Sequence, residues 1–307
     1  MTPALEVLKR PPADADAAAP SGFRPAGIAF GLLGLSAAVV ALGANATAAT
    51  DLNPSTLAWT FGLAVAGFAA AKVGIAVTLM GILKRLWLRV DGVKATLPHL
   101  QAAAEPDPGV RYGDIDTPFG RATASPQALG PLPIHRMAQR LWAPMVAMGP
   151  MLVAGGFVFA IVQSRTADAA DYNTFGAWAQ GLQFLGEGLL LAGISFLLGT
   201  ILASLRSGGG EVQESLGLTV KTLKMPVTAK LFVGLMAIGL MAAMVQFVLY
   251  IPAAYVDDPS AWFAFLAPLR EFALGALLAG IVLALYTIGT VLGFQFDRIK
   301  QIIVSGR

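Results

Sequence analysis

Residues 188–202 read GLLLAGISFLLGTIL, a stretch without a single charged side chain. It is apolar on every side, so it matches neither the one-sided stripe of a surface helix nor the alternating polarity of a barrel strand. A backbone that crosses hydrocarbon must satisfy its own hydrogen bonds, and a helix does so within one segment. This stretch therefore predicts a transmembrane helix.

The rest of the chain has the same character. Of its 307 residues only 13% are charged and 56% are hydrophobic, and the chain holds 34 Gly and 19 Pro. Soluble domains carry about 25% charged residues. The composition excludes an ordinary water-soluble protein and is typical of a polytopic integral membrane protein.

Charged residues mark the ends of six apolar runs. A bilayer core of about 30 Å needs roughly 20 residues of helix. The runs therefore predict six transmembrane helices, and we expect an all-α fold in which these helices form three hairpins. Their expected ranges are approximately 26–45, 58–83, 142–163, 181–204, 230–251 and 270–295.

The hairpins and their connections divide the chain into seven parts. We expect a disordered tail (1–25), hairpins at 26–83, 142–205 and 230–296, a Pro-rich loop (84–141), an amphipathic segment (206–229) and a C-terminal segment (297–307). Inside the loop, VRYGDIDTPFGRATA has the turn formers of a short β-hairpin. EVQESLGLTVKTLKM, residues 211–225, has the apolar spacing of an amphipathic helix.

The first apolar run has two interpretations. AGIAFGLLGLSAAVVALGANATA, residues 26–48, has the length and the Ala-Asn-Ala sequence of a cleavable signal peptide. We favour an uncleaved helix, because a long segment precedes the run and a full-length span is available.

Basic residues gather on one side of the predicted bundle. Segments 1–25, 84–141, 206–230 and 297–307 hold 18 of the 21 Lys and Arg residues. The positive-inside rule therefore predicts that both termini face the cytoplasm and that the chain is a multi-pass protein of the cell (plasma) membrane. The opposite segments carry Asp51, Asp168, Asp171, Asp257 and Asp258.

The second helix of each hairpin carries a recurring pattern. A Gly-Ile pair begins at Gly74, Gly193 and Gly280, and each time a Leu follows five positions after the Gly and an Ile eight positions after it. The recurrence indicates an internal triplication, in which three hairpins would enclose a central seam. The other interpretation is coincidence, because membrane helices draw on a small set of residue types.

Two ionisable residues lie deep in the predicted spans. Burying a charge at membrane depth costs at least about 2.5–3.5 kcal/mol. Lys72 and Glu187 differ by four residues in the repeat register, about 6 Å along a helix, which a lysine side chain can cover. We expect them to form an ion pair, with Gln183 one turn away. It would act as a clasp between helices or, alternatively, as a proton or ion relay; we favour the clasp because a relay needs more titratable groups in series.

Arg270 and Glu271 begin the last predicted helix. A glutamate suits a helix N-terminus, and an arginine there can reach the outer headgroups. We expect an outer-interface anchor, with substrate binding at the outer mouth as the alternative.

The sequence also excludes several classes of chemistry. It has no Cys, which rules out thiolate ligands and thiol catalysis, and its two histidines, His99 and His135, lie in a polar Pro-rich stretch. No nucleotide-binding or hydrolase motif occurs. The acidic group around Asp114 and Asp116, with Glu105 and Asp107, lacks calcium-loop spacing. We therefore expect no enzyme activity, no metal and no cofactor.

The formal net charge of +3 is spread along the membrane rims, so we expect contact with the lipid bilayer and no nucleic-acid partner. The function we expect is a non-catalytic integral membrane subunit or scaffold that anchors other membrane or cytoplasmic protein subunits. The alternative is a small-solute or ion transporter, with proton coupling as one form, that uses Lys72 and Glu187.

Overall fold

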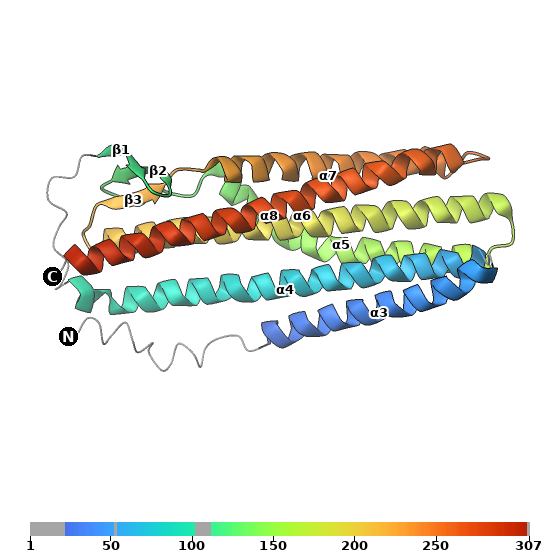
Figure 1. Ribbon diagram of the computed structural model, residues 1–307, viewed down its shortest axis with the longest axis horizontal. Coiled ribbons are helices and arrows are strands. Elements are labelled where there is room, and N and C mark those ends of the chain that lie inside the picture. Colours follow the sequence, from blue (N-terminus) through green and yellow to red (C-terminus); the bar gives the residue numbers. More distant parts are fainter. Residues whose placement is uncertain (1–21, 52–53, 102–111, 306–307) are drawn as a thin grey trace.

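The computed structural model describes residues 22–51, 54–101 and 112–305. Six long helices lie side by side in an elongated bundle (Figure 1). They are α3 (Phe23–Asp51), α4 (Pro54–Gln101), α5 (Pro133–Arg165), α6 (Ala169–Ser215), α7 (Val227–Ala253) and α8 (Ser260–Ser305). All six are long and apolar enough to cross a membrane, which confirms the predicted six-span fold.

The helices pack as three consecutive hairpins, α3 with α4, α5 with α6 and α7 with α8. The first helices have 29, 33 and 27 residues, whereas the second helices have 48, 47 and 46. At 1.5 Å per residue the second helices are about 70 Å long, more than twice the hydrocarbon thickness. They therefore extend well past the membrane at one end of the bundle.

Helix α6 occupies the centre, where the sequence predicts a seam. It contacts α4, α5, α7 and α8, and 72% of its most apolar window is buried, against 17–28% in the other five helices. The central seam was a wrong prediction, because the middle hairpin contributes its second helix as the core. The other helices expose apolar side chains to the lipid.

A small antiparallel sheet covers one end of the bundle (Figure 1). Strands β1 (Gly113–Thr117) and β2 (Gly120–Ser125) form the hairpin expected in the Pro-rich loop, and β3 (Val220–Leu223) pairs with the far edge of β2. The sheet packs on the ends of α6 and α8 through Ala122, Leu223 and Phe294. We call this the sheet end, and the end with the α5–α6 and α7–α8 connections the turn end.

The amphipathic helix predicted for residues 211–225 was wrong. Helix α6 runs on to Ser215, Gly217 turns the chain at a φ of 68°, and β3 follows. The spacing of Val212, Leu216, Val220 and Leu223 fits a helix, but a glycine at positive φ ends one, and Val220 and Thr222 favour a strand. Glycines 208 to 210 lie inside α6.

Two hairpins are held by glycines that face each other. A Cβ on Gly34 would lie 2.4 Å from the Gly67 carbonyl oxygen, and one on Gly149 would lie 2.8 Å from that of Gly186. No side chain fits in either place. Such close contact lets backbones gain dispersion energy where lipid supplies no hydrophobic drive.

The repeat glycines occupy equivalent places. Gly74 faces α3, Gly193 faces α5 and Gly280 faces α7, so each one lies against the first helix of its own hairpin. This equivalence supports the triplication, which stays a prediction. Residues 1–21 of the predicted tail, Glu105 and Asp107 lie outside the described residues.

Candidate functional site: an intramembrane charge cluster

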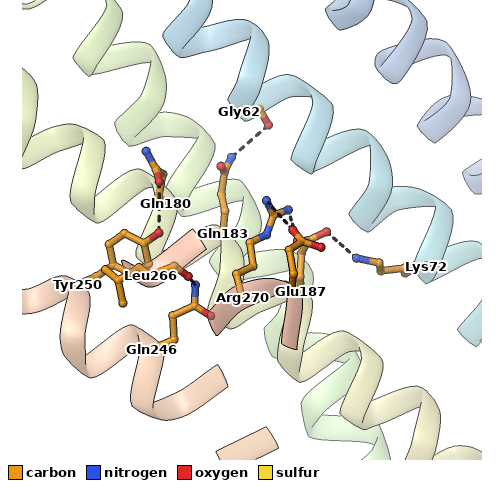
Figure 2. Close-up of polar contacts among 10 residues, drawn as sticks. Gly62, Lys72, Gln180, Gln183, Glu187, Gln246, Tyr250, Leu266 and Arg270 are labelled. Carbon is orange, nitrogen blue, oxygen red and sulfur yellow. Dashed lines mark hydrogen bonds and ion pairs between the residues drawn. The ribbon is translucent and has the colours of Figure 1, made fainter. Parts of the chain in front are cut away.

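The second helix of each hairpin contributes one charged side chain to a single cluster (Figure 2). Lys72 lies on α4, Glu187 on α6 and Arg270 on α8. Lys72 Nζ is 2.5 Å from Glu187 Oε1, and Arg270 Nη2 is 3.1 Å from Glu187 Oε2. The ion pair expected between Lys72 and Glu187 is present, and Arg270 completes it.

Glu187 is the buried centre of this cluster. It is 2% exposed, and the side chains of Lys72 and Arg270 are 16% and 22% exposed. Gly186 and Gly188 flank it: Gly186 packs on the backbone of Gly149, and Gly188 faces Ala243. The small neighbours bring α5 and α7 close to α6, so Glu187 is shielded on both sides and both of its oxygens turn to cations.

Lys72 and Glu187 lie at the same distance from the starts of their helices. Each comes eighteen residues in, about 27 Å along the axis, whereas Arg270 comes ten residues in, about 15 Å. Arg270 Nη2 nevertheless reaches Glu187 Oε2 at 3.1 Å, so α8 begins closer to the level of Glu187 than α4 and α6 do. On its way the Arg270 guanidinium passes over the Phe184 ring, with Cζ 3.9 Å from the ring centroid, a favourable cation–π geometry.

Arg270 does not begin its helix as the sequence predicted, and its role at the outer interface stays a prediction. Helix α8 begins at Ser260, ten residues earlier than expected, so Arg270 is inside the helix and reaches Glu187. Asp258 caps this helix by accepting a hydrogen bond from the Ser260 N–H, which lowers the pKa of the Asp258 carboxyl. The predicted start of this helix was wrong because the sequence interpretation ended spans at charges, whereas Arg270 is paired. Glu271 stays largely exposed, 3.8 Å from Arg270.

The cluster carries a formal charge of +1. Two cations share one carboxylate, and Glu271 contributes only a long and exposed contact. Arg270 also has a buried Nε without a hydrogen-bond partner. Removing either cation would leave a balanced pair, whereas removing Glu187 would leave two cations in the membrane.

Polar side chains on the turn-end side of the cluster are used in contacts between helices (Figure 2). Gln183, which the sequence places beside the ion pair, donates to the Gly62 carbonyl on α4 at 3.1 Å and does not bond Glu187. Gln246 of α7 donates to the Leu266 carbonyl of α8, and the Tyr250 hydroxyl donates to Gln180. These bonds tie neighbouring helices together at membrane depth.

A cleft of about 460 Å³ opens beside Arg270. Its walls are aromatic, with Phe61, Phe184, Tyr250 and Phe263, and Arg270 and Glu271 are the charged residues that line it. It has the mixed character of a small-molecule site. Among the described residues, however, no group of three His, Asp or Glu side chains is arranged to hold a metal ion.

A second polar network was missed from the sequence. Arg298 of α8 is 4% exposed; it donates to Gln213 Oε1 at 3.0 Å and to the Thr219 carbonyl at 3.1 Å. Gln213 in turn bonds the backbone of Lys221 in β3. This network fixes the sheet to the ends of α6 and α8. The sequence interpretation counted Arg298 only as a rim charge, because its partners lie about 80 residues away along the chain.

The structure therefore confirms Lys72 and Glu187 as partners, adds Arg270, and separates Gln183 from them. Comparison with known proteins gives no further assignment: no protein-family model, curated protein or solved structure matches this chain.

Proposed function

We propose that this protein is a non-catalytic integral membrane subunit, a rigid six-helix anchor that holds partner proteins at its sheet end. The observation that carries the proposal is the closed charge cluster. Both oxygens of Glu187 are bound by cations from two other hairpins, at 2.5 and 3.1 Å. A carboxylate held in this way joins three hairpins.

The sheet end supports the partner-binding part. Helices α4, α6 and α8 extend beyond the length that a membrane needs, and the sheet is built on α6 and α8. Strand β1 lies at one edge of the sheet, and within the described residues no strand pairs with its outer side. An open edge offers backbone donors and acceptors to an extended peptide of a partner. The basic rim residues support a cytoplasmic position for this end under the positive-inside rule.

The test is crosslinking from β1 in living cells. A photoreactive amino acid at Asp116, which is 92% exposed on β1, should yield a discrete product heavier than the chain. The same photoreactive group at Asp171, which is exposed at the turn end, is the matched control and should give no crosslinked product. If neither position gives a crosslinked product, and the protein purifies as a monomer in mild detergent, the subunit function would be contradicted.

The cleft beside Arg270 favours a second candidate, translocation of a small anionic solute or ion past Lys72 and Glu187. A transport cycle must hydrate Lys72 at some stage. The chain has no Cys, so Lys72→Cys can be probed with a charged thiol reagent. Ile75→Cys, on the lipid-facing side of α4, is the control. Reaction at position 72 but not at 75 would favour transport, and no reaction at either would favour the anchor.

A further inference from the structure

A second cavity lies near the sheet end, on the face of α6 between α5 and α7. Its volume is about 70 Å³. Residues of α5, α6, α7 and α8 line it, together with the link between β3 and α7. Helices α5 and α7 both pack on α6, and within the described ranges they make no extensive contact with each other, so the cavity lies in the gap between them.

Two basic side chains enter this cavity with unused hydrogen-bonding atoms. His135 of α5 and Arg206 of α6 both line it. Nδ1 of His135 and Nε of Arg206 are each buried without a hydrogen-bond partner. A buried donor without a partner costs about 1–3 kcal/mol, and more for a charged group. Arg206 Nε is always a donor, and His135 Nδ1 is one when it carries the ring proton, so a single acceptor in the cavity would satisfy both atoms.

The electrostatic surroundings select an anion. Lys224 is the third basic residue of the lining, and among the residues that the structure describes no Asp or Glu lines the cavity. The carboxylate that Lys224 does bind, Asp114, lies on β1, with Nζ and Oδ2 2.6 Å apart. Within the described part of the chain, His135 and Arg206 therefore have no anionic partner inside the cavity.

Two helix N-termini add to this field. Helix α7 begins at Val227 beside the cavity, and His135 lies in the first turn of α5. Neither N-terminus has a side-chain cap. The N-terminus of a helix carries a partial positive charge, so both ends favour an anion.

Size and wall chemistry specify the ligand further. A volume of 70 Å³ holds about two water molecules, which is also the scale of one phosphate group. The deeper walls are apolar, with Phe196, Phe232 and Met236. Arg136 and Arg140 on α5 mark this level as the membrane rim, where lipid phosphates lie.

We propose that this cavity binds one phosphate group, supplied by an acidic phospholipid of the adjoining leaflet, with His135 and Arg206 as ligands. The acyl chains would leave through the gap between α5 and α7. Inorganic phosphate presents the same oxygens without the chains, so it is the other possible source. The site is independent of the charge cluster at Glu187 and of the subunit function.

The experiment measures retention of phosphatidylglycerol by native mass spectrometry of the full-length protein released from nanodiscs. Arg206→Gln should weaken retention about tenfold, the equivalent of one lost charged hydrogen bond. Arg206→Lys should recover part of it. Arg136→Gln removes the same charge one residue from His135, at an exposed position, and should change retention less than threefold.

A second arm identifies the source of the phosphate. If inorganic phosphate in excess leaves phosphatidylglycerol bound to the wild-type protein, the lipid is the ligand. If inorganic phosphate binds the lipid-free protein and Arg206→Gln abolishes this binding, the phosphate site holds but its ligand is the free anion. Equal retention by Arg206→Gln and Arg136→Gln, in protein that elutes as the folded wild type does, would overturn the proposal.

Discussion

At the scale of single residues, the chain places one carboxylate among two cations and lets three helices share it. Lys72 and Arg270 come from different hairpins, and both approach Glu187, at 2.5 and 3.1 Å. The three residues therefore differ in how many charged partners each one has. Each cation has one strong partner here, whereas Glu187 binds both, and the membrane makes an unpaired charge expensive.

Substitutions in the cluster should follow this inequality. Glu187→Gln keeps the shape but leaves two buried cations, so the free energy of unfolding should fall by about 3–5 kcal/mol. Lys72→Met removes a charged hydrogen bond of about 1.5–3 kcal/mol and, with it, an insertion cost of about 2.5 kcal/mol, so the net change should stay near 1 kcal/mol or less. Unfolding by SDS in mixed micelles measures both. A Lys72→Met variant as unstable as Glu187→Gln would show that the lysine has a role beyond charge balance.

At the scale of helices, the glycine positions decide how closely the two helices of a hairpin approach each other. Gly149 of α5 meets Gly186 of α6 next to Glu187, so the same contact that packs the middle hairpin also positions the carboxylate. Gly155, on the same helix, has nothing within 4 Å of the place that a Cβ would take. The two glycines form a matched pair for testing close packing.

Gly149→Leu should destabilise the protein by about 1–3 kcal/mol, because the new side chain meets a carbonyl oxygen that cannot move without shifting α6. Gly155→Leu should leave the unfolding free energy within about 0.5 kcal/mol of the wild type. The same SDS titration reports both values. If the two variants are equally stable, the glycine contact does not hold the hairpin.

The sheet end depends on Arg298 in a comparable way. Arg298→Met removes the bonds to Gln213 and to the Thr219 carbonyl and leaves Gln213 Oε1 with fewer donors. The turn before β3 should then open more often, and limited proteolysis within residues 216–226 should accelerate about tenfold or more. Lys300→Met, an exposed change two residues away, is the control and should be cleaved at the wild-type rate.

Some elements could be predicted from the sequence and others could not, for physical reasons. The spans and the ion pair between Lys72 and Glu187 could be predicted, because the membrane makes both charge and polar backbone costly. The start of α8 was placed too late, although the apolar run SAWFAFLAPL before Arg270 and the capping Asp258 were visible signals. Strand β3 and the Arg298 network depend on pairing between distant segments, which helical spacing does not report.

At the scale of the whole molecule, charge asymmetry predicts one orientation. The basic rim lies toward the sheet end and the acidic connections lie at the turn end. From the positive-inside rule we predict that the sheet lies in the cytoplasm. In that orientation the extended ends of α4, α6 and α8 would lie where the proposed cytoplasmic partners are.

The absence of Cys makes orientation directly measurable. Asp257→Cys at the turn end should react with a membrane-impermeant maleimide on intact cells, because the predicted orientation puts this loop outside. Gln127→Cys, exposed beside β2, should react only after the cells are opened. The reverse pattern would invert the topology and move the partner-binding surface to the other side of the membrane.

The central claim is that charge balance around Glu187 joins the three hairpins, and one comparison tests it most directly. Glu187→Leu alone is compared with the triple change Lys72→Met, Glu187→Leu and Arg270→Met by SDS unfolding. If the pairing of charges holds the hairpins together, the unfolding free energy of Glu187→Leu should fall by about 3–5 kcal/mol. That of the triple variant should return to within about 1–2 kcal/mol of the wild type. A triple variant as unstable as Glu187→Leu would contradict the claim.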